Sequence, residues 1–130
     1  MSTVFLTLDE VLEIHRDQID RYGGSTGIRD LGLLESAISM PRASFGGQML
    51  HSDLHHVAAA YLFHIVQNHP FVDGNKRVGA VAAYVFLAVN DMDLIAKETD
   101  YEELVLSVAR SETDKDAIAE FFKQNVSKSD

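Results

Sequence analysis

The feature that most constrains the fold is the apolar stretch from Val78 to Val89, which is interrupted only by Gly79 and Tyr84. A stretch of this length is too short to cross a bilayer and is typical of a core helix. We expect a helix over about 75–89 that is apolar all round and therefore has neighbours on every side. The 130 residues suffice for one such core, so we expect a single domain over 1–130.

Apolar residues at helical spacing, together with capping residues, predict the remaining helices. We expect them over about 8–22, 30–40 and 53–67, with two more that begin at Thr99 and Thr113. The predicted class is therefore all-α, built around the apolar helix as its central buried element.

Strand signals are confined to a Gly-rich interruption at 42–50 and to the first few residues. Gly46 and Gly47 separate two short apolar pieces, which is typical of a loop or a small hairpin. We expect no other strand, and we expect the tail at 127–130 to be frayed.

Composition excludes several classes of function. Cysteine is absent, so disulfides, thiolate nucleophiles and cysteine-based metal sites are excluded. The net charge of −9 argues against a general nucleic-acid binder, because phosphate backbones repel an acidic chain. The first residues lack the basic region and long apolar stretch of a signal peptide, so we expect a cytoplasmic protein with no membrane partner.

A polar segment at 68–77 lies directly before the apolar helix. Pro70 and Gly74 predict a turn there. The first turn of the helix that follows has free backbone amides and the positive end of the dipole, which together form a natural seat for phosphate.

Four side chains of this segment add chemistry to the phosphate seat. His69 can take up a proton near neutral pH, and Asp73 supplies a hard oxygen that can hold Mg²⁺ beside phosphate oxygens. Lys76 and Arg77 add positive charge, as a point charge and a planar fork respectively.

Each of these residues also has an ordinary structural explanation. Residues 73–75, Asp-Gly-Asn, are a common turn, and Lys76 with Arg77 is a common solvated helix start. A single loop histidine is more often structural than catalytic. The occurrence of all these features within one loop nevertheless favours a phosphate pocket with a metal ligand and a base.

One known family shares this arrangement. The Fic motif reads His-Pro-Phe-x-(Asp/Glu)-Gly-Asn-x-Arg, and residues 69–77, His-Pro-Phe-Val-Asp-Gly-Asn-Lys-Arg, resemble it. Lys76 is the form found in the Doc branch, the death-on-curing toxins of toxin–antitoxin modules. Residues 21–24 and 27–37 also resemble Doc-type toxins. The resemblance covers about 8–89 and implies a compact all-α Fic fold.

The resemblance implies an enzyme that uses ATP and Mg²⁺ to modify a hydroxyl of a protein target. His69 would be the general base, Asp73 would hold Mg²⁺, and Phe71 would be structural. The phosphates would be bound by Gly74, Asn75, Lys76, Arg77 and Arg21.

The resemblance also implies a flap that docks the target's extended segment by strand pairing. Phe45, Gly46 and Gly47 would form this flap.

Two departures from the family pattern bear on the reaction. AMP-transferring Fic enzymes usually have Gly after the motif Asn and a second Arg three residues after the first, where this chain has Lys76 and Ala80. Without that Arg the nucleotide would bind reversed, with its γ-phosphate in the seat, as in Doc-type kinases. The implied target is elongation factor Tu, phosphorylated on a threonine. Gln67 stands where Doc has an arginine, which would weaken one phosphate contact.

The self-inhibitory pattern of some Fic proteins, Ser/Thr-x-x-x-Glu-Gly/Asn, is not evident, because 25–29 and 107–111 lack its Glu. The resemblance therefore implies restraint by a separate antitoxin, in the manner of Phd, that inserts a helix into a groove.

Three alternatives remain open. One is an AMP-transferase. Another is a metal phosphohydrolase, since metal sites favour two histidines four apart, as His51 and His55 are. His56, His64 and His69 add to that histidine content. The last alternative is a non-enzymatic module that binds an antitoxin.

Overall fold

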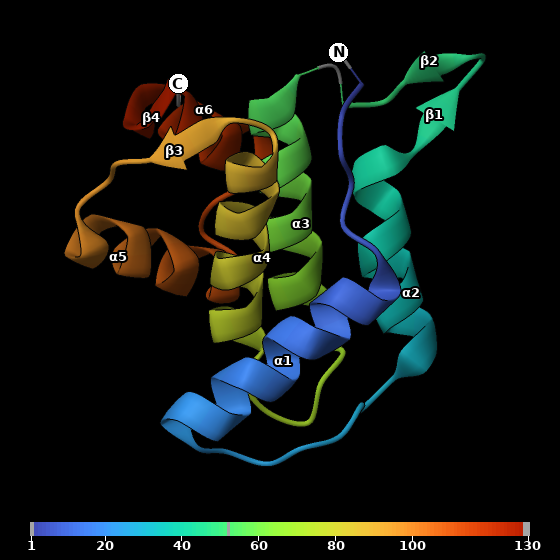
Figure 1. The fold of residues 1–130 in the computed structure, drawn as a ribbon, viewed down its shortest axis with the longest axis vertical. Helices are drawn as coiled ribbons and strands as arrows, with labels where there is room; N and C mark the ends of the chain where they lie inside the picture. The colour runs from blue at the N-terminus through green and yellow to red at the C-terminus, as the bar shows by residue number, and fades with distance from the viewer. Residues whose placement is uncertain (1, 52, 129–130) are drawn as a thin grey trace.

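The computed structural model describes residues 2–51 and 53–128, apart from the side chain of Phe45. The elements are α1 (Leu8–Tyr22), α2 (Leu31–Ser39), the 3₁₀ turn η1 (Met40–Arg42), β1 (Ser44–Phe45), β2 (Gln48–Met49), α3 (Leu54–Asn68), α4 (Asn75–Val89), β3 (Met92–Leu94), α5 (Glu98–Ala109), α6 (Lys115–Asn125) and β4 (Val126–Lys128). The predicted all-α class is confirmed (Figure 1).

The most enclosed helix is α3, which packs against α2, η1, α4, α5 and α6. Its middle is buried all round, from Val57 through Leu62, with Ile65 and Val66 following. Alanines at 58–60 let the neighbouring helices approach closely, and Tyr61 fills the core while its hydroxyl accepts from the Leu6 N–H at 2.8 Å. The predicted central buried helix was the one over 75–89, which is α4, and in the structure α3 takes that central place instead.

Helix α4 differs from the expectation that it has neighbours on every side. It packs against α1, α3, β3 and α5, but Tyr84 is 49% exposed and Val89 is 45% exposed. One face of an apolar helix thus stays open, because the fold supplies covering elements only along the others. Within the described residues, no helix combines the length and apolar character needed to span a membrane.

Capping side chains fix most helix starts where the sequence predicts them. Thr7 and Glu10 form a complete capping box at α1. Asp30, Asp53 and Asp114 each accept a backbone N–H at the start of α2, α3 and α6. Helix α6 is capped one residue after the predicted Thr113, and α4 has no side-chain cap. Helix α5 begins at Glu98, before the predicted cap at Thr99, and Lys97 occupies its N-cap position without a side-chain bond.

The strands are a partial surprise. The hairpin of β1 and β2 lies in the expected Gly-rich interruption. The antiparallel pair of β3 and β4 was not expected, and it shows that the prediction of a frayed tail is wrong for 127–128. Residues 129–130 lie outside the described residues. Strands β3 and β4 have three residues each, which is too few to show an alternation of apolar and polar residues in the sequence.

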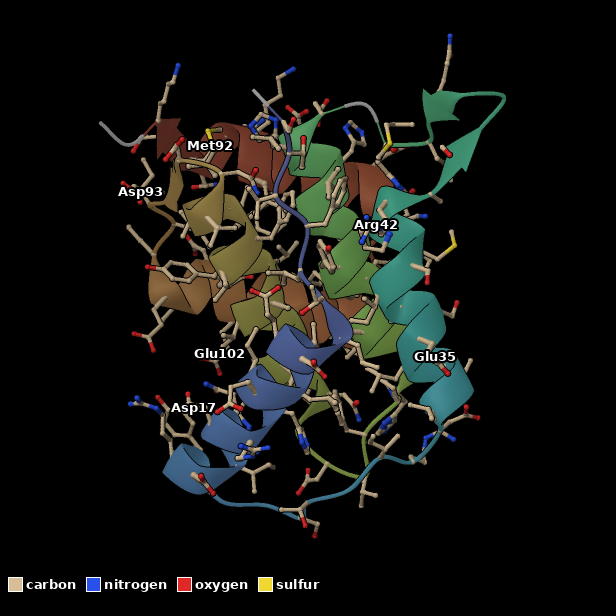
Figure 2. All side chains as sticks on the ribbon, turned by 45° about the vertical axis from the view of Figure 1, so that its right-hand side comes forward. Asp17, Glu35, Arg42, Met92, Asp93 and Glu102 are labelled. Carbon is tan, nitrogen blue, oxygen red and sulfur yellow. The ribbon has the colours of Figure 1, made fainter. Side chains whose placement is uncertain are left out.

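The hairpin and the polar connection lie at opposite ends of α3 (Figure 1). The hairpin precedes the first residue of α3, and His69 caps the last. A helix of this length spans about 22 Å. Acidic side chains such as Asp17, Glu35 and Glu102 stand on the outside of the helices (Figure 2).

Candidate active site

The polar segment that carries the predicted chemistry connects α3 to α4. His69 caps α3 with a left-handed backbone, at φ 51° and ψ 51°. Gly74 precedes α4 with φ 83°, a conformation that glycine adopts without steric cost. A pocket of about 550 Å³ opens here and is lined by Val66, His69, Val72, Asp73, Gly74, Asn75, Lys76, Arg77 and Ala109.

Asn75 organises this connection from a buried position. Its Oδ1 accepts from the Phe71 N–H at 2.9 Å and its Nδ2 donates to the Phe71 carbonyl at 3.0 Å. The second Nδ2 hydrogen donates to Nδ1 of His69. Because the main chain of Phe71 fixes which end of the amide is nitrogen, the neutral His69 ring carries its hydrogen on Nε2. Phe71 itself is fully buried, in line with its expected structural role.

The N-terminus of α4 is the seat that the sequence predicts for an anion. Gly74 is the N-cap residue, and no side chain caps the helix. The first-turn N–H groups therefore lack the partners that the capped helices provide, and they carry the positive end of the dipole. An anion in the pocket would complete this helix end.

Asp73 lies on the rim of the pocket with an ionised carboxylate. Its Oδ2 accepts from the Ser25 N–H at 3.1 Å and its Oδ1 accepts from the Gly74 N–H at 2.9 Å. These donors hold the pKa of the Asp73 carboxyl below its usual range. Mg²⁺ at phosphate sites needs one or two carboxylates, with water and phosphate oxygens as its other ligands. A single ionised carboxylate beside an anion seat fits that requirement.

The two cations of the segment behave differently. Lys76 is exposed and lines the pocket. Arg77 also lines the pocket, but its Nη2 donates to the Gly23 carbonyl at 2.9 Å and its guanidinium lies 5.8 Å from the centre of the Tyr22 ring. Arg77 thus binds the end of α1 while it faces the pocket.

A segment that sequence reasoning did not assign to the site runs along the connection. We call residues 23–30 the strap. Its Ile28 forms an antiparallel bridge with Phe71, and its Gly27 carbonyl accepts from the Val72 N–H at 3.1 Å. The sequence signal was the glycine content: the three strap glycines all have positive φ.

His15 was also missed. It projects from α1 with only 6% exposure, and its ring stacks on Phe71 with 3.9 Å between centroids. Its Nε2 lies 3.0 Å from the Asp73 carbonyl oxygen, to which it donates. His15 lies four residues after the buried Val11 and therefore on the apolar face of the helix. This spacing is the feature of the sequence from which its burial could have been predicted.

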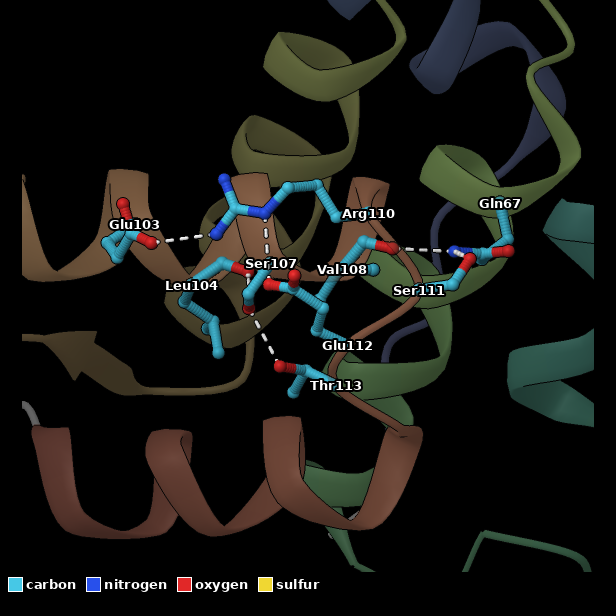
Figure 3. A network of polar contacts seen from close by, with 9 residues as sticks. All are labelled: Gln67, Glu103, Leu104, Ser107, Val108, Arg110, Ser111, Glu112 and Thr113. Carbon is cyan, nitrogen blue, oxygen red and sulfur yellow. Dashed lines mark hydrogen bonds and ion pairs between the residues drawn. The ribbon is translucent and has the colours of Figure 1, made fainter.

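Gln67 does not point to a phosphate position. Its Nε2 donates to the Val108 carbonyl at 2.6 Å and to the Ser111 hydroxyl at 3.2 Å (Figure 3). These bonds tie α3 to the end of α5. Ala109, between the two acceptors, therefore lies at the pocket wall.

Other predicted site residues lie elsewhere. Arg21 is exposed and donates to Asp17 at 2.8 Å, and it does not line the pocket. Residues 45–47 form the hairpin at the far end of α3, so the structure does not bring them to the pocket (Figure 1).

The remaining histidines form no metal centre. His55 and His56 lie within 4 Å of the Asp53 carboxylate, and Nε2 of His64 accepts from Lys115 at 3.1 Å. Across residues 2–51 and 53–128, no group of three or more His, Cys, Asp or Glu is placed to hold a metal ion.

A second depression adjoins the pocket. It has a volume of about 410 Å³ and shares Lys76 and Arg77 with the first. Its walls come from α1, α4 and α5 and are mainly apolar, including Ala80, Val105 and Leu106. We call it the α1–α5 groove.

Known proteins resemble this chain over most of its length. The model of the Fic/DOC family matches residues 5–87. The chain is 40% identical over 100 residues to "Toxin Doc" of Mycolicibacterium smegmatis, covering 75% of this chain and 77% of that protein. It is 28% identical over 116 residues to "Protein kinase doc" of Escherichia phage P1, covering 89% and 90% of the two chains.

Proposed function

Because the chain belongs to the Fic/DOC family, we propose that it is the toxin of a type II toxin–antitoxin module. The proposed reaction is transfer of the γ-phosphate of ATP to a Ser or Thr hydroxyl of a protein. The observation that carries the proposal is the shared pocket, in which His69, Asp73 and the uncapped N-terminus of α4 meet.

His69 is the proposed base for the target hydroxyl. As the proton leaves, the hydroxyl oxygen bonds to the γ-phosphorus and the bond to ADP breaks. In the described state Asn75 donates to Nδ1, so the ring hydrogen is on Nε2. Uptake of a proton at Nε2 requires that hydrogen to move to Nδ1. If the Asn75 amide donated to a phosphate oxygen and no longer to Nδ1 of His69, this shift of the hydrogen would be possible.

The phosphates would be held by the first turn of α4. The Asn75 N–H, the Lys76 ammonium and the Arg77 guanidinium supply the positive field, and the Gly74 N–H would join them only after leaving Oδ1 of Asp73. Asp73 would hold Mg²⁺, which when bound neutralises charge on the phosphate oxygens. Arg21 would join only after leaving Asp17.

Kinase chemistry is proposed over AMP transfer for two reasons. Lys76 and Ala80 stand where AMP-transferring relatives have Gly and Arg, which favours a reversed nucleotide with its γ-phosphate in the seat. In addition, one of the similar proteins bears the name "Protein kinase doc". The proposed target is elongation factor Tu, whose phosphorylation would stop translation in the cytoplasm.

A Phd-like antitoxin is the proposed partner, in keeping with the toxin name of a relative. The α1–α5 groove has the apolar lining that an amphipathic helix needs, and it adjoins Lys76 and Arg77. A helix in this groove would restrain the site from outside the chain. Toxicity on expression of the chain alone, relieved by the antitoxin, is the expected behaviour. Harmless expression of folded protein would point to a non-enzymatic module.

The mass of the modified target tests the reaction. We expect elongation factor Tu incubated with the protein, Mg²⁺ and ATP to gain about 80 Da, whereas AMP transfer would add about 329 Da. His69→Asn is the matched variant, because asparagine tolerates the left-handed backbone at this position. It should abolish the gain and keep the fold. An unmodified target with the intact chain would contradict the proposal.

A further inference from the structure

His69 occupies an unusual backbone position for a residue with a bulky side chain. Its φ of 51° is left-handed, a region that non-glycine residues visit at a steric cost. It also follows the last turn of α3, where carbonyl oxygens have no helical partner. Something outside the helix must therefore stabilise this turn.

Arg29 of the strap supplies that stabilisation. Its Nε donates to the His69 carbonyl at 2.6 Å and its Nη2 donates to the Asn68 carbonyl at 2.9 Å. The Arg29 N–H donates to the Pro70 carbonyl at 2.7 Å, as the Asp30 N–H does at 3.0 Å. One residue thus binds three successive carbonyls of the turn that carries His69.

The guanidinium suits this task for two physical reasons. Its planar fork offers two parallel donors, which match two neighbouring carbonyls. Its charge also lies at the negative end of the α3 dipole. A lysine at position 29 would offer a point charge without this fixed fork, so it would orient the two carbonyls less firmly.

We propose that Arg29 is the positioning residue for His69, holding the left-handed turn so that the imidazole stays in the pocket. The proposal rests on the proposed function of His69 as the base. It assigns Arg29 no contact with the nucleotide, because Arg29 does not line the pocket and its Nε and Nη2 bind the carbonyls at 69 and 68.

Kinetics of Arg29→Met test the effect on the reaction. We expect kcat to fall about 10- to 100-fold through loss of alignment, with KM for ATP within about twofold of the intact protein. Arg29→Lys should recover part of the loss. Arg16→Met, which removes an exposed arginine paired with Glu13, is the control and should keep kcat.

Nuclear magnetic resonance of the histidine rings gives a readout that needs no activity. The His69 ring signals, assigned from their loss in His69→Asn, should move in Arg29→Met and stay in place in Arg16→Met. Unmoved signals with unchanged kcat would overturn the proposal, and so would a raised KM with unchanged kcat. If Arg29→Met does not fold, Arg29→Lys decides by the same measurements. If the intact protein transfers no phosphate, the proposed function fails while the ring signals still decide the role of Arg29.

Discussion

The side chain of Asn75 makes three hydrogen bonds, two to the main chain of Phe71 and one to Nδ1 of His69. Together these bonds fix the tautomer of His69. In Asn75→Asp the carboxylate would accept from Nδ1–H, so we expect the ring hydrogen to move from Nε2 to Nδ1. The ¹⁵N shifts of the His69 ring report this directly. Loss of the bond to the Phe71 carbonyl should also lower the free energy of unfolding by about 1–3 kcal/mol. Unchanged ¹⁵N shifts would show that Asn75 does not set the tautomer.

The proposed role of Asp73 as a Mg²⁺ ligand predicts that its carboxylate stays available in mildly acidic solution. Its pKa is held below the usual value by N–H donors from Ser25 and Gly74. The carboxylate therefore stays ionised as the pH falls from 7 to 5. Its negative charge is lost only when the pH falls below the lowered pKa. We expect Mg²⁺ to strengthen ATP binding at both pH 7 and pH 5, as measured by calorimetry, with a weakening at pH 5 no larger than the proton uptake of the ATP terminal phosphate explains. Asp73→Asn should remove the Mg²⁺ effect at both values; a Mg²⁺ effect that is lost by pH 5 would contradict the ionised carboxylate.

At the scale of elements, the strap depends on a close approach at Gly24. A Cβ built there would lie 2.7 Å from Oδ2 of Asp73 and 3.3 Å from Nη2 of Arg77, and φ is +120°. Gly24→Ala should therefore push the strap off the pocket and weaken binding of Mg²⁺-ATP about tenfold, a loss of about 1.4 kcal/mol. Gly23→Ala is the matched control, because it also has positive φ but meets no atom within 4 Å.

Both glycine variants should lose stability, since each forces alanine into a left-handed region. Only Gly24→Ala should also lose affinity for the nucleotide, whereas Gly23→Ala should keep it. Equal affinity in the two variants would show that the strap does not shape the pocket.

Element starts were predictable from sequence where a single side chain decides them. Thr7, Asp30 and Asp53 cap helices that begin where expected. The pairing of β3 with β4 was not predictable, because each strand has three residues and α5 and α6 separate them in the sequence. The strap was missed for a similar reason: apart from those of the Arg29 side chain, its bonds to the connection are made by its backbone groups, which every residue carries.

At the scale of the whole molecule, the residues of the candidate pocket could be predicted because they are contiguous in sequence. The motif at 69–77 supplies seven of the pocket residues, and only Val66 and Ala109 come from elsewhere. The supports from α1 and the strap, His15 and Arg29, are distant in sequence and required the fold. The net charge of −9 is a sum over the whole chain. It is compatible with local positive charge in the pocket, where Lys76 and Arg77 lie.

The interface of α3 with α6 should make the whole fold sensitive to acid. Partial burial and the Lys115 ammonium, 3.1 Å from Nε2, lower the pKa of His64 to about 4 from 6.5. Between these values His64 is protonated in the unfolded chain but not in the folded protein. The free energy of unfolding therefore falls as the pH falls from about 6.5 towards 4. Because the ring is only partly buried, we expect a loss of about 1–2 kcal/mol between pH 7 and pH 5.

His64→Gln tests this origin, because the amide oxygen still accepts from Lys115 but does not titrate. Denaturant unfolding at pH 7 and pH 5 should show a smaller drop for the variant than for the intact protein. Some drop should persist, since burial also lowers the pKa of the nearby His51. His56→Gln is the control: His56 is more exposed and pairs with Asp53, so its removal should not flatten the pH dependence. Equal drops in the intact protein and His64→Gln would place the acid sensitivity outside this interface.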